Sequence, residues 1–79
     1  MPKVRVFSTP PCPYCRTLKE FLKDHQIEFE DIDVSKDASA REAMVKGSGQ
    51  IGVPVVAIDD EFIVGFDRAN IVKLLNIKE

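Results

Sequence analysis

Residues 4–15 read VRVFSTPPCPYC, and this stretch determines how the rest of the chain is arranged. Residues 3–8 overlap the start of this stretch. Val4, Val6 and Ser8 alternate there with three other side chains, and the segment is rich in residues that favour β-strands, which predicts a strand. Pro10 and Pro11 have no N–H to donate to a sheet, so the chain leaves the strand there. Apolar residues at helical spacing follow from Pro13 and predict a helix of about three turns. The stretch therefore predicts a strand, a short loop and a helix in immediate succession.

The rest of the chain continues this alternation. Ser39 and Glu42 resemble a capping box at the start of a second helix, which we expect to end at Gly47. The other expected elements are a strand over 27–34, two strands over 53–58 and 61–64 that reverse at 59–60, and a last helix capped by Asp67.

The predicted order is β-α-β-α-β-β-α. It indicates the α/β class, with a four-stranded mixed sheet flanked by three helices in a single domain over residues 1–79. Reacting groups in open α/β sheets gather after the carboxyl ends of strands. Cys12 and Cys15 fall at such a place.

Composition excludes several classes of function. The 79 residues carry 11 basic and 13 acidic side chains, a net charge of −2, so we expect no nucleic-acid partner. No apolar run approaches the roughly 20 residues that span a bilayer, so we expect no membrane partner. Because the N-terminus lacks the apolar segment of a secretory signal, we expect a cytoplasmic protein, and we expect it to be a monomer.

The two cysteines form a C-x-x-C motif between a strand and a helix, which is the usual setting of redox-active thiols. The N–H groups at a helix start favour a thiolate, so Cys12 is the predicted nucleophile. Cys15 lies one turn inside, where lower exposure and a higher pKa suit a resolving thiol. Pro13 occupies a position where proline costs no hydrogen bond. Arg16 and Lys19 are close in sequence, but the helical period does not fix which way their side chains point.

Other interpretations of the cysteine pair compete with redox exchange. A closed zinc site needs two more ligands, and the sequence offers only His25 and carboxylates. An iron-sulfur cluster needs four ligands, so a cluster carrier would have to pair two chains through Cys12. A plain binding module with incidental thiols is a third alternative. The motif favours redox exchange over all of these.

Pro54 opens an apolar stretch, and proline is tolerated in a strand only at its start or at an edge. One interpretation is that Pro54 simply begins the strand. In the other, the Val53–Pro54 bond is cis and turns backbone groups toward the reactive sulfur, where they could align an extended ligand.

Three motifs together resemble the glutaredoxin family of the thioredoxin fold: the sequence CPYC over 12–15, GVPVV over 52–56 and GFD over 65–67. The resemblance implies that Cys12 attacks a substrate disulfide, that Cys15 resolves the product and that Pro54 is the cis-proline. It also implies a glutathione or substrate groove and no tightly bound cofactor. The implied groove residues are Tyr14, Val53, Pro54, Gly65, Phe66 and Asp67.

The sequence departs from the family pattern at Thr9. Glutaredoxins usually carry Lys or Arg at this position, three residues before the first cysteine, to pair with a glutathione carboxylate. Two electron donors therefore stay open: glutathione, or a thioredoxin reductase, as in small redoxins that serve ribonucleotide reductase. In either case we expect disulfide-containing proteins as substrates.

Some residues have simpler predicted roles. The acidic residues of 28–33 are expected to form a solvated face, and His25 a structural or solvent-facing residue near a helix end. Phe66 either packs under the groove or contacts a partner. No Asp lies in the first strand to take a proton from Cys15, so we expect water or a substrate thiol to do so.

Overall fold

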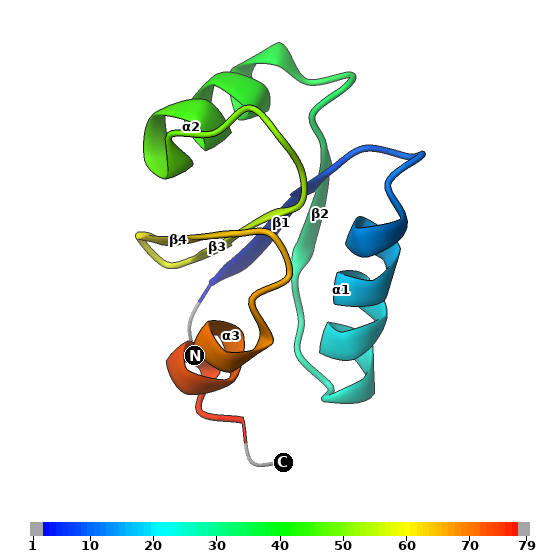
Figure 1. The fold of residues 1–79 in the computed structure, drawn as a ribbon, viewed down its shortest axis with the longest axis vertical. Helices are drawn as coiled ribbons and strands as arrows, with labels where there is room; N and C mark the ends of the chain where they lie inside the picture. Colours follow the sequence, from blue (N-terminus) through cyan, green and yellow to red (C-terminus); the bar gives the residue numbers. More distant parts are fainter. Residues whose placement is uncertain (1–2, 78–79) are drawn as a thin grey trace.

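The computed structural model describes residues 3–77, and within them it contains one four-stranded sheet and three helices (Figure 1). The strands are β1 (Val4–Ser8), β2 (Glu30–Asp33), β3 (Val55–Ile58) and β4 (Glu61–Val64). Their order across the sheet is β2-β1-β3-β4, with β1 parallel to β2 and the other two pairs antiparallel. The predicted mixed sheet and element order are confirmed.

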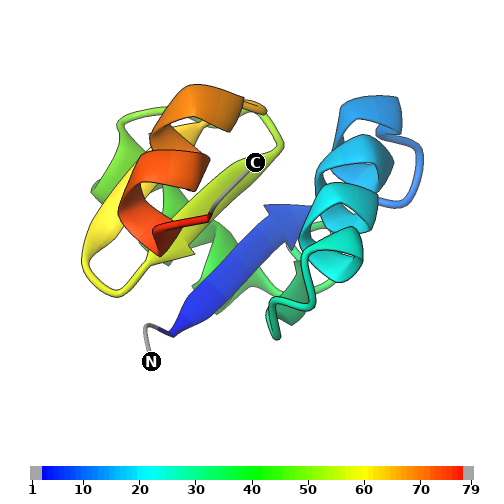
Figure 2. The ribbon, with the colours of Figure 1, turned by 90° about the horizontal axis from the view of Figure 1, so that it is seen from below.

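The helices cover both faces of the sheet. Two of them, α1 (Pro13–Asp24) and α3 (Arg68–Leu75), lie on one face, and α2 (Ala38–Ser48) lies on the other (Figure 2). No helix within residues 3–77 is both long and apolar enough to cross a membrane. The two central strands are thus covered on both sides, which explains why β3 is apolar and buried along its whole length.

The core divides into two clusters because side chains alternate across the sheet. One cluster joins β1, β3 and β4 to α1 and α3 through the buried residues Val4, Val6, Leu18, Leu22, Val56, Ile58, Ile63 and Ile71. The other faces α2 and contains Phe7, Val34, Met44, Val55 and Ala57. Leu18 and Leu22 are fully buried, so the first cluster fixes the position of α1 and of the cysteines at its start.

Both predicted ends of the second helix were wrong by two residues. Asp37, not Ser39, is the N-cap: its carboxylate accepts a hydrogen bond from the Ala40 N–H at 3.0 Å. Ser39 lies inside the first turn, where its backbone is already helical. At the other end the helix continues through Gly47, and Gly49 is the C-cap, with the left-handed φ of 74° that glycine adopts at low cost.

Gly47 has a different role, which is to allow α2 to approach the sheet. A Cβ atom at Gly47 would overlap the ring of Phe62 on β4. The Phe62 ring stacks near Phe7 with 6.2 Å between centroids, and the Arg5 guanidinium lies 5.9 Å from the Phe62 ring centre. The Phe62 ring is therefore restrained by these two side chains of β1, and the missing side chain at Gly47 provides the space between helix and strand.

We expect Gly47→Ala to lower the free energy of unfolding by about 1–3 kcal/mol, because the added methyl overpacks the contact with Phe62. Helix propensity alone predicts the opposite, a gain of about 1 kcal/mol. Urea unfolding of the two proteins measures the difference. Gly52→Ala is the matched control, since a Cβ at Gly52 meets nothing within 4 Å. A more stable Gly47→Ala protein would contradict the packing argument.

Candidate functional site

Cys12 is the N-cap residue of α1. Its backbone is extended (φ −86°, ψ 112°), and its sulfur accepts a hydrogen bond from the Cys15 N–H at 3.2 Å. The loop is closed by a second hydrogen bond, from the Cys12 N–H to the Thr9 carbonyl at 3.2 Å. A cap residue normally offers an oxygen to the free N–H groups of the first turn. Here the acceptor is the partly exposed sulfur that the sequence predicts to be the nucleophile.

Cys15 lies on the buried side of the same turn and is 1% exposed. Burial raises the pKa of its thiol to about 11, and the hydrogen bond with Cys12 and the charge of Cys12 act in the same direction. A backbone hydrogen bond from Thr9 and the positive charge of Lys19 lower the pKa of Cys15 in opposition. Cys15 is thus a neutral thiol at neutral pH. The predicted contrast in exposure between the two cysteines is confirmed, as is the higher pKa expected of Cys15.

Two hollows flank Cys12, and the side chain of Arg16 lines both of them. The first lies beside the basic side of α1 and is lined by Thr9, Pro10, Cys12, Arg16, Lys19, Glu20 and Lys23. The second is lined by Pro10, Pro11, Cys12, Pro13, Arg16 and Thr17. Helical spacing left the orientation of Arg16 and Lys19 open, and the structure places both beside Cys12.

An ion pair next to these hollows was missed in the sequence. The Lys19 Nζ lies 3.1 Å from the Asp31 Oδ2, and the hydroxyl of the buried Ser8 donates to the Asp31 Oδ1 at 3.1 Å. Asp31 is exposed, as expected of a solvated acidic face, but it also has these two partners, which the sequence analysis did not predict. The predicted parallel pairing of β1 with β2 could have indicated this contact, because it places Asp31 beside β1, two residues from the partner of Ser8.

The groove residues implied by the resemblance lie in three separate segments of the chain. Tyr14, in the first turn of α1, is 69% exposed. The Val53–Pro54 bond is cis, and the Pro54 carbonyl accepts a hydrogen bond from the Gly65 N–H at 2.8 Å. The structure thus joins the loops before β3 and after β4 to each other. None of the three residues Val53, Pro54 and Gly65 lines either hollow beside Cys12.

Phe66 and Asp67 both have structural partners. The Phe66 ring is partly buried and packs edge-on against Phe21 of α1, with 5.5 Å between centroids. Asp67 is the N-cap of α3 and accepts a hydrogen bond from the Asn70 N–H at 3.3 Å, as predicted. The contact between Phe66 and Phe21 connects the start of α3 with the helix that carries the cysteines.

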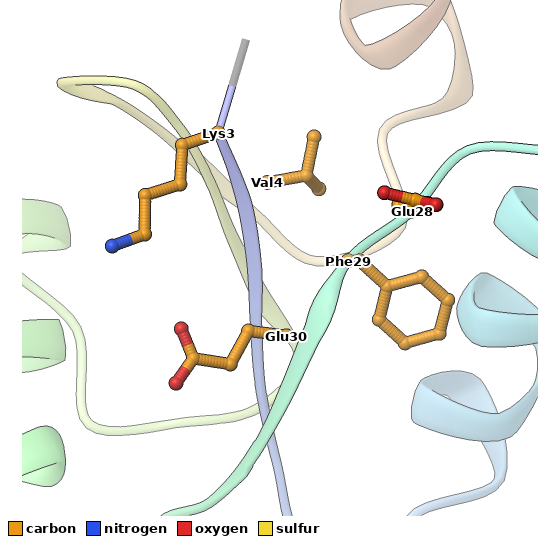
Figure 3. A pocket seen from close by; sticks show the side chains of 5 residues that line it. All are labelled: Lys3, Val4, Glu28, Phe29 and Glu30. Carbon is orange, nitrogen blue, oxygen red and sulfur yellow. The ribbon is translucent and has the colours of Figure 1, made fainter. Parts of the chain in front are cut away.

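A separate pocket lies at the other end of the sheet (Figure 3). It is lined by Lys3, Val4, Glu28, Phe29 and Glu30. These residues surround the beginnings of β1 and β2, whereas Cys12 follows the end of β1. The pocket is therefore distant along the strand from the thiols. Residues 3–77 contain no group of three or more His, Cys, Asp or Glu side chains that could hold a metal ion.

Comparison with known proteins identifies the family. The family model described as glutaredoxin matches residues 4–63. The chain belongs to the glutaredoxin family. It is 47% identical over 72 residues to a glutaredoxin-like 8.6 kDa protein in the rubredoxin operon of Clostridium pasteurianum, covering 91% of this chain and 96% of that one. It is 34% identical over 67 residues to glutaredoxin 3 of Escherichia coli, covering 85% and 81% of the two chains.

Solved structures agree with this assignment. The chain superposes on a point mutant of the thioredoxin-like protein BC3987 with a TM-score of 0.91 and 40% identity, over 99% of this chain and 100% of that one. The NrdH-redoxin of Escherichia coli, a glutaredoxin-like protein described by its thioredoxin-like activity profile, gives a TM-score of 0.79 at 25% identity, over 98% and 99%. The fold is the thioredoxin fold, and this glutaredoxin-family chain is a small redoxin.

The contrast between the two cysteines predicts selective alkylation. Reduced protein treated with iodoacetamide at neutral pH is expected to carry one adduct, on Cys12, because the thiolate is the reactive form and Cys15 is both buried and protonated. A pKa of about 11 means that the Cys15 thiolate fraction rises about tenfold per pH unit until pH 11, so its labelling rate rises with it. Peptide mass spectrometry measures both sites. We expect equal labelling of Cys12 and Cys15 only after denaturation. Equal labelling of the two cysteines in the folded protein at neutral pH would contradict the assignment of Cys12 as the reactive thiol.

Proposed function

We propose that the protein is a dithiol thiol-disulfide oxidoreductase in which Cys12 is the attacking thiol and Cys15 the resolving one. The observation that carries the proposal is the pair itself: an accessible sulfur that caps α1, bonded to the N–H of a second cysteine that is buried one turn further on. Because only Cys12 is accessible from the flanking hollows, a substrate disulfide meets that sulfur first.

The exchange takes place in two steps. The Cys12 thiolate attacks a substrate disulfide, forms a mixed disulfide and releases one substrate thiolate. Cys15 then loses its proton and attacks the Cys12 sulfur, which forms the Cys12–Cys15 bond and releases the second substrate thiol. The substrate gains two electrons and the protein loses two. A separate electron donor must return them before the next cycle.

We assign the substrate groove to Tyr14, Val53, Pro54, Gly65, Phe66 and Asp67. The exposed Tyr14 ring can form one wall beside Cys12. The backbone of Val53 can pair with an extended segment of substrate. Asp67, as a helix cap with its carboxylate partly exposed, can also meet an amino group, while Phe66 supports the groove from beneath. We place this activity in the cytoplasm, where thiols are kept reduced.

The electron donor separates two versions of this function. Thr9 lines the basic hollow in place of the Lys or Arg that pairs with a glutathione carboxylate in typical glutaredoxins. The lack of that cation supports the second version, in which a thioredoxin reductase reduces the protein and ribonucleotide reductase is its target. The similarity to the NrdH-redoxin, with its thioredoxin-like activity profile, supports it as well.

The order of attack is tested by two serine variants. Cys12→Ser is expected to lose all measurable reduction of an insulin-type protein disulfide, since the nucleophile is gone. Cys15→Ser is expected to stall as a mixed disulfide through Cys12, because nothing resolves it. Mass spectrometry of the trapped adduct under non-reducing conditions gives the measurement. Full activity of Cys12→Ser, or an adduct on Cys15, would refute the assigned order.

The donor is tested by supplying NADPH with either thioredoxin reductase or glutathione and glutathione reductase. We expect thioredoxin reductase to reduce the oxidised protein faster. Thr9→Lys should raise the glutathione-dependent rate roughly tenfold, because a charge-assisted contact to a carboxylate contributes about 1.5 kcal/mol or more. Thr9→Met, which adds length without charge, is the control. Efficient reduction of the native protein by glutathione, unaffected by Thr9→Lys, would rule out the role given to Thr9.

A further inference from the structure

The resolving step requires Cys15 to become a thiolate although its side chain is buried. Cys15 is 1% exposed, and burial is the main reason that its pKa is raised. Two further causes come from Cys12, through its hydrogen bond and its charge. Both act only while Cys12 is free. Once the Cys12 sulfur is bonded to a substrate it carries no charge, so burial remains as the influence that opposes ionisation of Cys15.

Two influences favour the Cys15 thiolate at that stage: first the backbone hydrogen bond from Thr9 and, more weakly, the charge of Lys19. Lys19 is four residues after Cys15, one turn along the same side of α1. Its side chain is 26% exposed, so its charge is only partly screened by water. Lys19 is therefore the side-chain cation that acts on the resolving thiol.

Asp31 holds Lys19 from the neighbouring strand. The ion pair is 3.1 Å long, and Asp31 is itself held by the hydroxyl of Ser8, which is 3% exposed at the end of β1. A carboxylate this close to an ammonium group offsets much of its potential at a third site. The field that reaches Cys15 from Lys19 is therefore set by how firmly Asp31 is held.

Other charged groups surround the pair without replacing it. Asp33 shares a small cavity with Lys19 and Asp31, but its pKa is lowered first by the Ser35 hydroxyl, so it stays ionised with a partner of its own. On α1 itself the remaining charged residues along the basic hollow are Arg16, Glu20 and Lys23. The ion pair with Asp31 is the close contact that restrains Lys19.

We propose that the Lys19–Asp31 pair sets the rate of the resolving step, with Lys19 stabilising the Cys15 thiolate and Asp31, fixed by Ser8, limiting that effect. This inference rests on the proposed dithiol function. Both residues are positioning residues that act through Cys15. Water or a substrate thiol is still the proton acceptor, as the sequence predicts.

Lys19 and Asp31 exchange no atoms or electrons in the resolving step. Cys15 transfers its proton to water or to the substrate thiolate released in the first step, and the Cys15 thiolate attacks the Cys12 sulfur. The Cys12–Cys15 bond forms as the bond from Cys12 to the substrate sulfur breaks, and the bonding pair leaves on the substrate thiolate.

The test uses a chromogenic aromatic disulfide mixed with reduced protein in a stopped-flow instrument. The first equivalent of coloured thiolate reports attack by Cys12, and the second reports resolution by Cys15. One unit of pKa changes the thiolate fraction tenfold, and the accompanying change in nucleophilicity offsets about half of that on a logarithmic scale. A shift of one unit would thus change the rate of the second phase about threefold, and we expect Lys19→Gln to slow this phase by up to that factor and to move its pH profile upward. Asp31→Asn should accelerate this phase by up to the same factor and move the profile downward.

Controls separate charge from structure. Lys19→Arg keeps the charge and should retain the native profile. Lys46→Gln removes an exposed charge from α2, on the other face of the sheet, and should leave the second phase unchanged. Circular dichroism and unfolding midpoints check that each variant is folded. If Lys19→Gln fails to fold, acceleration in Asp31→Asn still decides, provided that iodoacetamide labelling shows Cys15 to be as protected as in the native protein, because exposure of Cys15 would itself favour the thiolate.

The outcomes distinguish this inference from the proposed function. An unaltered pH profile in Lys19→Gln, or slowing by both Lys19→Gln and Asp31→Asn, would overturn the role of the ion pair while leaving the dithiol mechanism intact. Failure of the native protein to release a second equivalent, or release of the first equivalent by Cys12→Ser at the native rate, would instead overturn the dithiol mechanism itself.

Discussion

The backbone N–H of Cys15 points at the sulfur of Cys12 across 3.2 Å, and the direction of that group is set by how α1 is held on the sheet. Leu18 and Leu22 anchor the helix against the central strands, with no exposed surface left on either. The two prolines before Cys12 end β1 and turn the chain into the helix. The geometry of the thiols therefore depends on packing along the next two turns of the helix.

The same packing gives the two sulfurs different environments, although the two cysteines are only three residues apart in the sequence. Cys12 is outside the first turn and faces solvent, while Cys15 belongs to the buried stripe that continues through Leu18. A nucleophile benefits from access and from the helix N–H groups. A resolving thiol benefits from being protected until a substrate is bound. The cost of that protection is the difficulty of ionising Cys15, which the charge of Lys19 partly offsets.

Periodicity and turn chemistry were sufficient to predict the element order, the mixed sheet and the contrast between Cys12 and Cys15. They failed where several residues compete for one local role. Asp37 and Ser39 are both acceptable helix caps, and only the path of the chain after β2 selects Asp37. Gly47 and Gly49 are likewise both plausible helix ends. The pair of Lys19 with Asp31 depends on where α1 crosses β2, and strand register and helix placement are properties of the assembled sheet rather than of either segment.

Because the Cys12 sulfur is also the cap of α1, the choice of replacement at this position affects more than reactivity. Serine keeps an acceptor for the Cys15 N–H, whereas alanine leaves that group without its partner and lets the first turn fray. An alanine variant would thus confound loss of the nucleophile with a displaced Cys15. The ordinary practice of treating serine and alanine as equivalent inactive forms does not hold for this helix start.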